Sequence, residues 1–338
     1  MRIAVTGSIA SDHLMSFPGR FADSLVVDQL DKISLSFLVD DLQIRRGGIA
    51  ANIAFGLGQL GLRPVLVGAV GQDFVDYRSW LDRHGVDTGH VRVSELLHTA
   101  RFICTTDVDH AQMASFYAGA MAEAREIELA PIAAATGGLD LVVISPNDPQ
   151  AMLRHTDECR DRGLPFVADP SQQLAWMEGD QIRRLVHGAS YLFTNAYEAS
   201  LIEQKTGWTH QDVLEQVGTR VITRGRDGAS VETREGVVAT VGTPAEVRRA
   251  DPTGVGDAFR AGYLAGLSWG ADAERCAQVG SMLATLVIET VGPQEYTVQA
   301  DTFCERLGLA YGSDAADEVR GYLGVPRATQ PVPPLGRR

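Results

Sequence analysis

The stretch DPTGVGDAFRAGYL, residues 251–264, places small residues and two carboxylates directly before a run with helical periodicity. The first turn of a helix leaves N–H groups without partners and carries partial positive charge, so it favours anions. Gly254, Val255 and Gly256 would offer such N–H groups, and Asp257 would be either a helix-start carboxylate or a base aimed at a hydroxyl. A carboxylate this close to the positive end of a helix should stay ionised, as a base must. The stretch predicts an anion site with an adjacent base, although a plain turn before a helix fits the same residues.

Two further stretches supply groups suited to a sugar. In RRGGIAANIAF, Gly48 permits close backbone approach to a ligand, and Asn52 offers both a donor and an acceptor. A strand-to-helix turn followed by a solvated asparagine is the alternative. Near the N-terminus, TGSIASDH places Ser8 and Asp12 just beyond a first predicted strand, where open α/β sheets bind their ligands. A carboxylate there can accept two hydrogen bonds from a vicinal diol.

The stretches TNAYE and TRGRDGAS each follow a predicted strand. Asn195 and Glu198 would lie on one face of a helix start. Glu198 could orient the waters of Mg²⁺, which binds proteins through few carboxylates and keeps most of its waters. A role like that of a capping box is the alternative. The turn around Gly225 and Gly228 is either a plain hairpin or a turn that clasps a nucleotide.

Other familiar chemistries have no local support. The chain lacks GxGxxG after its first predicted strand, and it has no Walker A, HExxH or GxSxG string. Its four cysteines are dispersed without a CxxC pair, which argues for reduced thiols rather than a disulfide framework or a zinc site. Any nucleotide must therefore be held in another way.

The composition is that of a globular protein with one large or two modest domains. The 338 residues are 45% hydrophobic and 22% charged, and 30 Lys and Arg against 43 Asp and Glu give a net charge of −13. This balance argues against nucleic-acid binding, which needs a basic surface. No apolar run approaches the ~18 residues that span a bilayer, and no secretory signal is evident. We therefore expect no membrane partner and a cytoplasmic location.

Strand-like and helical stretches alternate along the chain, which predicts a mostly parallel sheet covered by helices on both faces. Strand-like runs lie at residues 2–8, 64–70, 139–145, 164–169, 190–195 and 219–225. Helical patterns occupy residues 49–60, 73–84, 149–162, 180–187, 196–206, 255–269, 272–290, 299–310 and 313–323. The expected fold class is a three-layer α/β fold.

Two stretches break this rhythm. Residues 32–46 and 99–117 alternate apolar and polar residues with a period of two, which is typical of half-exposed antiparallel strands. Outside a βα core they would form a small β-sheet, either a lid over a cleft or a dimerisation surface, and the two can coexist. The Pro-rich residues 326–338 are predicted to be a disordered tail.

Taken together, GG..AN, the central N..E and DPTGVGDAF resemble, in this order, the ribokinase-like (PfkB) family of carbohydrate and nucleoside kinases. The resemblance covers roughly residues 1–310, and its visible departure is Val255, where the family commonly has a smaller residue. Longer stretches such as HTARFICTTDVDHAQMASFYAGAM and DPSQQLA are similar to the actinobacterial adenosine kinases within this family.

The resemblance implies one ribokinase-like kinase domain over residues 1–325, with a lid formed by about residues 10–46 and 99–117. It implies phosphorylation of adenosine by ATP to give AMP and ADP, a requirement for Mg²⁺, K⁺ as a further candidate activator, and a homodimer through the lid sheet.

The resemblance also implies roles for individual residues. Asp257 would take the proton of the 5′-hydroxyl, while the backbone amides of residues 254–256 stabilise the transferred phosphoryl group. With Asp257, the residues implied to contact adenosine are Ser8, Asp12, Ser36, Gly48, Asn52, Phe102, Phe116, Gln172 and Gln173, the two phenylalanines flanking the base. Those implied to contact ATP are Asn195, Thr223, Arg224, Gly225, Arg226, Asp227, Gly228 and Gly256, while Glu198 would act on Mg²⁺ through water. Trp176 would either contact the base or pack on the surface.

Two alternatives stay open. A ribokinase, or a kinase for inosine or guanosine, would keep the same catalytic stretch, but a free sugar has no flat face for Phe102 and Phe116 to cover. A nucleoside-binding sensor without chemistry would have no need for Asp257, Asn195 and Glu198.

Overall fold

The computed structural model describes residues 1–24 and 36–324. Its centre is an eight-stranded sheet of order β14-β13-β12-β11-β10-β9-β1-β4. The strands are β1 Ile3–Thr6, β4 Val65–Val67, β9 Leu141–Ile144, β10 Phe166–Ala168, β11 Tyr191–Asn195, β12 Thr219–Thr223, β13 Ala229–Thr233 and β14 Gly236–Val241. The six strands from β4 to β12 pair in parallel, and β13 and β14 add an antiparallel edge. The predicted mostly parallel sheet is confirmed.

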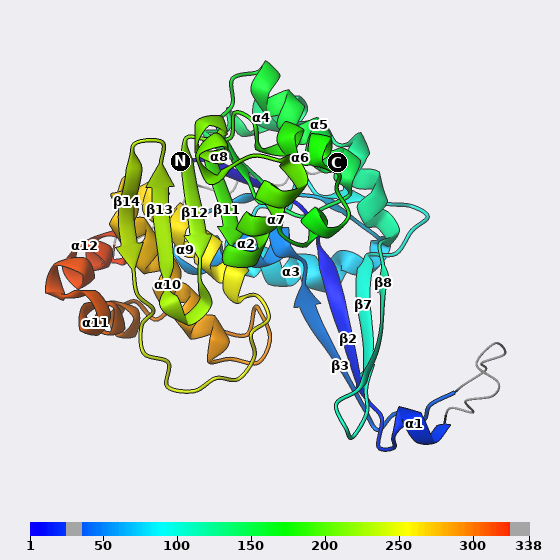
Figure 1. The fold of residues 1–338 in the computed structure, drawn as a ribbon. Coiled ribbons are helices and arrows are strands. Elements are labelled where there is room, and N and C mark those ends of the chain that lie inside the picture. The colour runs from blue at the N-terminus through cyan, green and yellow to red at the C-terminus, as the bar shows by residue number, and fades with distance from the viewer. Residues whose placement is uncertain (25–35, 325–338) are drawn as a thin grey trace, which may run out of the picture.

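Helices cover both faces of this sheet (Figure 1). One layer consists of α2 Ile49–Gln59, α3 Val75–Arg83, α9 Val255–Trp269, α10 Ala273–Ile288, α11 Ala300–Tyr311 and α12 Ser313–Leu323. The other layer consists of α4 Leu129–Thr136, α5 Pro149–Asp161, α6 Gly179–Val186, α7 Ala196–Thr206 and α8 His210–Gln216. Successive strand residues serve opposite layers: in β1, Ile3 and Val5 pack into the first core and Ala4 into the second. The sequence pattern missed α4 and α8, because eight and seven residues show few turns of periodicity.

A separate four-stranded sheet projects from the body (Figure 1). Its order is β3-β2-β7-β8, from β3 Asp41–Gly47, β2 Ala10–Ser16, β7 Ala100–Thr106 and β8 Gln112–Tyr117. The short helix α1 Phe21–Ser24 lies at its far end. The small sheet is confirmed, and β7 and β8 within residues 99–117 pair antiparallel as expected. The strand β2 was not predicted from the sequence pattern, and it pairs in parallel with β7. Residues 32–35 of the predicted strand and the predicted tail, 326–338, lie outside the described residues.

Smaller elements complete the chain. A two-stranded parallel sheet pairs β5 Ala69–Val70 with β6 Arg92–Val93. The four cysteines are all buried free thiols. Within residues 1–24 and 36–324, no helix combines the length and apolarity that crossing a membrane requires.

Candidate active site

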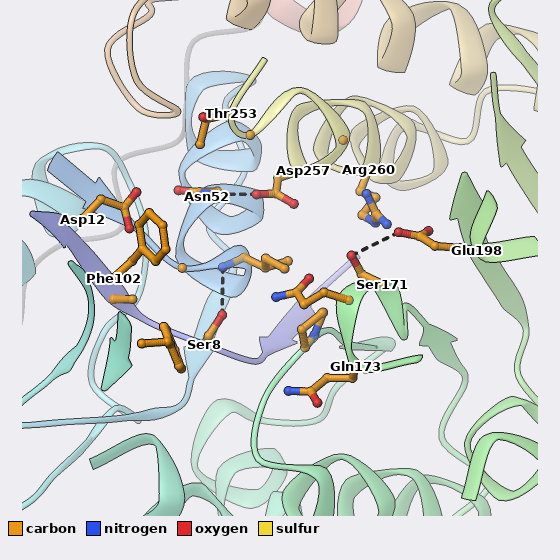
Figure 2. Close-up of a pocket in the computed structure, with 18 of the residues that line it drawn as sticks. Ser8, Asp12, Asn52, Phe102, Ser171, Gln173, Glu198, Thr253, Asp257 and Arg260 are labelled. Atoms are coloured by element: carbon orange, nitrogen blue, oxygen red, sulfur yellow. Dashed lines mark hydrogen bonds between the residues drawn. The ribbon is translucent and has the colours of Figure 1, made fainter. Parts of the chain in front are cut away.

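A pocket of about 770 Å³ lies where the carboxyl ends of the parallel strands meet the small sheet (Figure 2). This is the position expected for a ligand site in an open α/β sheet, because side chains that follow neighbouring strands converge there. The predicted residues that line it are Ser8, Asp12, Gly48, Asn52, Phe102, Phe116, Gln172, Gln173, Asn195, Glu198, Thr223, Gly254, Gly256 and Asp257. Segments more than 200 residues apart in the chain thus form one cavity.

The small sheet aligns three of these residues in a row. Asp12 on β2 is paired in register with Phe102 on β7, and Phe102 with Phe116 on β8. Directly opposed residues of neighbouring strands point to the same face of a sheet, so the row faces the pocket. A carboxylate next to two aromatic rings suits a molecule with a diol at one end and a flat ring at the other.

Asp12 is the charged member of this row. Burial raises the pKa of its carboxyl to about 6, with Arg45 opposing the rise and Asp251 adding to it. Arg45 is itself bound to Asp251, with 3.2 Å between Nη1 and Oδ2. Asp12 is therefore mostly ionised at neutral pH and loses its capacity to accept two hydrogen bonds in mild acid.

The backbone at Gly48 lies close to the backbone around Ser8. Gly48 adopts φ of +92°, and a Cβ there would lie 2.6 Å from the Ser8 carbonyl oxygen and from the Ala10 nitrogen. No side chain fits, so the start of α2 approaches β2 closely. The hydroxyl of Ser8 accepts a hydrogen bond from the Ile49 backbone N–H at 3.0 Å, and Ser8 therefore also anchors the helix start.

Asp257 lies in the first turn of α9, opposite the small sheet. The preceding Gly254 is left-handed at φ of +78° and provides no side-chain cap. The Val255 N–H donates to the Pro252 carbonyl at 3.4 Å, which leaves the next N–H groups of the first turn to another acceptor. Asp257 is buried, and its Oδ2 accepts a hydrogen bond from Nδ2 of Asn52 at 2.8 Å. Asn52 is equally buried, so the alternative of a solvated asparagine is wrong.

Burial raises the pKa of Asp257, whereas Arg260 and the hydrogen bond from Asn52 lower it and Glu198 raises it further. The sequence suggested that the helix start keeps this carboxylate ionised, but the helix start alone does not do so. Desolvation was the missing factor, and the neighbouring donors oppose it.

Arg260 is a lining residue that the sequence reasoning missed. Its Nη2 lies 2.6 Å from Oδ1 of Asp169, an aspartate with no exposed surface. Burial raises the pKa of Asp169 to about 7, although Arg260 opposes the rise. The guanidinium lies among Asp169, Glu198 and Asp257, all of which favour its charged form. The sequence contained a signal for this pair, because Arg260 is one turn after Asp257 in the stretch 251–264 and Asp169 ends a predicted strand.

Glu198 has the capping role and also faces the pocket. Its Oε2 accepts a hydrogen bond from the Asn195 backbone N–H, and its own N–H donates to Oδ1 of Asn195, both at 2.8 Å. Its other oxygen, Oε1, is 3.4 Å from the Ser171 hydroxyl (Figure 2). The described part of the chain contains no cluster of three or more His, Cys, Asp or Glu arranged for a metal.

This donor set would fit Mg²⁺ held by nucleotide phosphates and water, since Oε1 of Glu198 could orient one of the waters. Bound there, the ion would neutralise charge on the phosphate oxygens.

Several predicted residues lie outside the pocket lining. Ser36 is exposed and precedes β3. Val255 packs its side chain against the core, and its N–H donates a hydrogen bond to the Pro252 carbonyl at 3.4 Å. In the turn after Thr223, residues 225–227 form a single 3-10 turn, and Arg224 donates to the Ser230 hydroxyl at 2.5 Å. Of the predicted ATP turn, Thr223 lines the pocket while Arg224, Gly225, Arg226, Asp227 and Gly228 do not. Lining residues without a predicted role are Ala10, Ile49, Met121, Pro146, Ser171, Thr253 and Arg260. Trp176, for which base contact and surface packing were both open, lines the pocket and is exposed.

Comparison with known proteins places the chain. The family model for pfkB family carbohydrate kinases matches residues 21–300. The chain belongs to the PfkB family. It is 31% identical over 271 residues to the nucleoside kinase of Methanothermobacter thermautotrophicus, across 79% of this chain and 86% of that protein. It is 26% identical over 308 residues to the nucleoside kinase of Methanocaldococcus jannaschii, across 90% of this chain and 96% of that protein.

A solved structure of a nucleoside kinase has a similar fold. The nucleoside kinase of Burkholderia thailandensis in complex with ADP-inosine is 35% identical and superimposes with a TM-score of 0.78, across 92% of this chain and 96% of that one. The predicted family and the ribokinase-like fold are thus confirmed, and the PfkB chain is a kinase, that is, a phosphotransferase.

Proposed function

We propose that this PfkB kinase transfers the γ-phosphoryl group of ATP to the 5′-hydroxyl of adenosine, giving AMP and ADP. One observation carries the proposal: a single pocket has the row of Asp12, Phe102 and Phe116 on one side and Asp257 at the start of α9 on the other. The row suits ribose and a flat base, and the helix start suits a phosphoryl group.

The proposed chemistry depends on position and charge more than on covalent steps. Asp257 accepts the proton of the 5′-hydroxyl as the oxygen attacks phosphorus and the bond to the ADP oxygen breaks. The N–H groups of residues 254–256 and the Arg260 guanidinium face the charge that develops on the transferred group. Asp12 and Ser8 hold the ribose hydroxyls.

Adenosine is preferred to a free sugar because Phe102 and Phe116 would cover nothing in a ribose complex. It is preferred to inosine because of Gln173, whose Nε2 donates to the Asn147 backbone carbonyl at 2.8 Å. That bond fixes the orientation of the amide, since only the NH₂ group can donate, and leaves Oε1 as an acceptor. An acceptor suits the 6-amino group of adenine and opposes the 6-oxo group of inosine or guanosine.

A second candidate is an inosine or guanosine kinase, since the Burkholderia relative was solved with inosine. We further propose that the small sheet acts as a lid and as the surface of a homodimer, because β8 is exposed throughout and, within the described part of the chain, no strand pairs with its outer edge. A cytoplasmic location, K⁺ activation and Mg²⁺ with ATP belong to the same proposal.

An ADP-release assay across adenosine, inosine, guanosine and ribose tests the proposal. Adenosine should have the highest kcat/KM, and Asp257→Asn should abolish most turnover with every acceptor. Fastest turnover of ribose would refute the nucleoside assignment, and fastest turnover of inosine would favour the second candidate. Nucleoside binding without ADP release would indicate a sensor instead.

A further inference from the structure

A chain of buried hydrogen bonds links the end of the small sheet to Asp257. The Tyr77 hydroxyl on α3 donates to the backbone carbonyl of Gly47, the last residue of β3, at 2.9 Å. Nε2 of Gln294, between α10 and α11, lies 2.5 Å from the Tyr77 oxygen and 2.9 Å from Oδ1 of Asn52. Nδ2 of Asn52 in turn donates to Asp257 at 2.8 Å. All four side chains are at most 9% exposed.

The direction of every bond in this chain is determined at one end. The Gly47 carbonyl can only accept, so the single hydrogen of the Tyr77 hydroxyl is used there. The Tyr77 oxygen can then only accept, which requires the NH₂ group of Gln294 to face it. The second N–H of that group donates to Asn52, which turns the Asn52 carbonyl toward Gln294 and its NH₂ group toward Asp257.

We propose that Tyr77 and Gln294 are positioning residues that hold the Asn52 amide in one orientation, so that Asp257 keeps one oxygen hydrogen-bonded and presents the other to the acceptor hydroxyl. This inference rests on the proposed function of Asp257 as base. The second oxygen of Asp257 points away from Asn52, on the side where Arg260 and Glu198 lie (Figure 2).

The alternative orientation shows why the two positioning residues matter. If the Asn52 amide were reversed, its carbonyl oxygen would face the Asp257 carboxylate, and two acceptors cannot share a hydrogen. The base would lose a donor that favours its ionised form and would rotate more freely. Gln294 and Tyr77 prevent this reversal, and neither of them lines the pocket.

Other titratable and charged groups face Asp257. Arg260 from α9 and Glu198 from α7 affect its pKa, and its own charge raises the pKa of Asp169 after β10, of Tyr77 from α3 and of Tyr296. Arg260 and the Asn52 donor favour the carboxylate, whereas Glu198 disfavours it. Loss of the Asn52 donor therefore raises the pKa of Asp257, and the acid limb of the pH–rate profile moves to higher pH.

Gln294→Leu tests the inference, with kcat, both KM values and the pH profile measured on the acceptor that the wild type turns over fastest. We expect kcat to fall about tenfold, the lower end for a lost hydrogen bond to a charged group. The acid limb should move up by about one pH unit, and KM should change little. Tyr77→Phe should shift both quantities in the same direction and serves if Gln294→Leu does not fold.

Gln59→Leu is the matched control. Oε1 of Gln59 accepts a hydrogen bond from the Val298 backbone N–H at 3.1 Å, so this glutamine anchors the segment that carries Gln294 without joining the chain. A similar loss of kcat in the Gln59 and Gln294 variants, with an unshifted acid limb, would show simple segment packing and overturn the inference. An unchanged profile in both Gln294→Leu and Tyr77→Phe would overturn it too.

A second readout separates this inference from the proposed function. The carboxyl resonance of Asp257, assigned in ¹³C-labelled protein with Asp257→Asn, gives its pKa without any turnover. A higher pKa in Gln294→Leu supports the positioning role even if no acceptor is phosphorylated, in which case the proposed function alone fails. An unchanged pKa overturns the positioning role whatever the activity.

Discussion

Replacing Asp257 with asparagine separates chemistry from folding in this site. The two side chains have nearly the same shape, and an asparagine oxygen can still accept the hydrogen bond that Asn52 donates at 2.8 Å. The substitution therefore preserves the packing of a residue that is only 9% exposed. It removes the capacity to take a proton, because an amide is not a base at neutral pH.

The expected loss of activity follows from the role of a general base. Such a group contributes about 10²–10⁴ in rate, and each factor of ten corresponds to ~1.4 kcal/mol of barrier. Asp257→Asn should therefore raise the barrier by roughly 3–5 kcal/mol. Adenosine affinity should change little, since Asp12 and the aromatic row lie on the opposite side of the pocket.

The effect on stability should have the opposite sign. The pKa of Asp257 is raised in the folded chain, chiefly by burial, so its ionised form disfavours folding at pH values above that pKa. This cost decreases as the pH falls below the folded pKa, and it is gone below the pKa of the unfolded chain. An asparagine never carries the charge, so the variant should melt at the same temperature as the wild type or higher at neutral pH.

A coupled ADP-release assay and thermal unfolding at neutral pH, on the same preparation, decide the matter. Loss of kcat with an unchanged or higher Tm is the expected pair of results. Turnover near the wild-type rate would refute the role of Asp257 as base. A marked drop in Tm would show that the carboxylate stabilises the fold, and the reasoning from burial would then be wrong.

Three other substitutions probe the surrounding groups. Asp12→Ala should weaken adenosine binding more than ATP binding in calorimetry, and equal losses of affinity would show that Asp12 does not hold the ribose. In the wild type, the adenosine KM should rise as the pH falls through about 6, where the Asp12 carboxyl protonates. Arg260→Gln should lower the free energy of unfolding by about 3 kcal/mol, since it leaves Asp169 buried without its cation. In the double variant with Asp169→Asn, urea unfolding should show most of the stability restored, whereas kcat should stay low. Glu198→Gln should keep the helix start intact and raise the Mg²⁺ concentration needed for half-maximal activity about tenfold, and an unchanged Mg²⁺ titration would contradict a role near the metal.

The fold could be predicted because its strands and long helices carry strong local patterns. The range predicted for α9, 255–269, matches the structure, since a glycine precedes this helix and another follows it. The strands predicted at 139–145, 164–169 and 190–195 lie next to one another in the centre of the sheet. They could be recognised because buried parallel strands are apolar almost throughout. The parallel pairing of β2 and β7 was missed, because a long-range pairing has no local signature.

The site was predictable where one motif supplies both the residue and its surroundings. Asp257 and Gly254 share one turn, and Ser8 and Asp12 follow one strand. Gln294 has no such neighbour: its role depends on Asn52, 242 positions away. Buried polar partners of this kind become visible only when the chain is folded, because each polar side chain must find a partner from another element.

The charges of the pocket set a condition on nucleotide binding. Asp169, Glu198 and Asp257 surround the Arg260 guanidinium, so the positive charge of Arg260 is already matched by neighbouring carboxyl groups, although burial raises the pKa of Asp169 and Asp257. The net charge of −13 on the whole chain adds no attraction for a polyanion. The uncapped first turn of α9 supplies N–H donors but only about half a positive charge. If the nucleotide is ATP, as we propose, it would need to bring its own counter-ion. The Glu198 carboxylate, which lines the pocket, is the protein group that could orient the waters of such an ion.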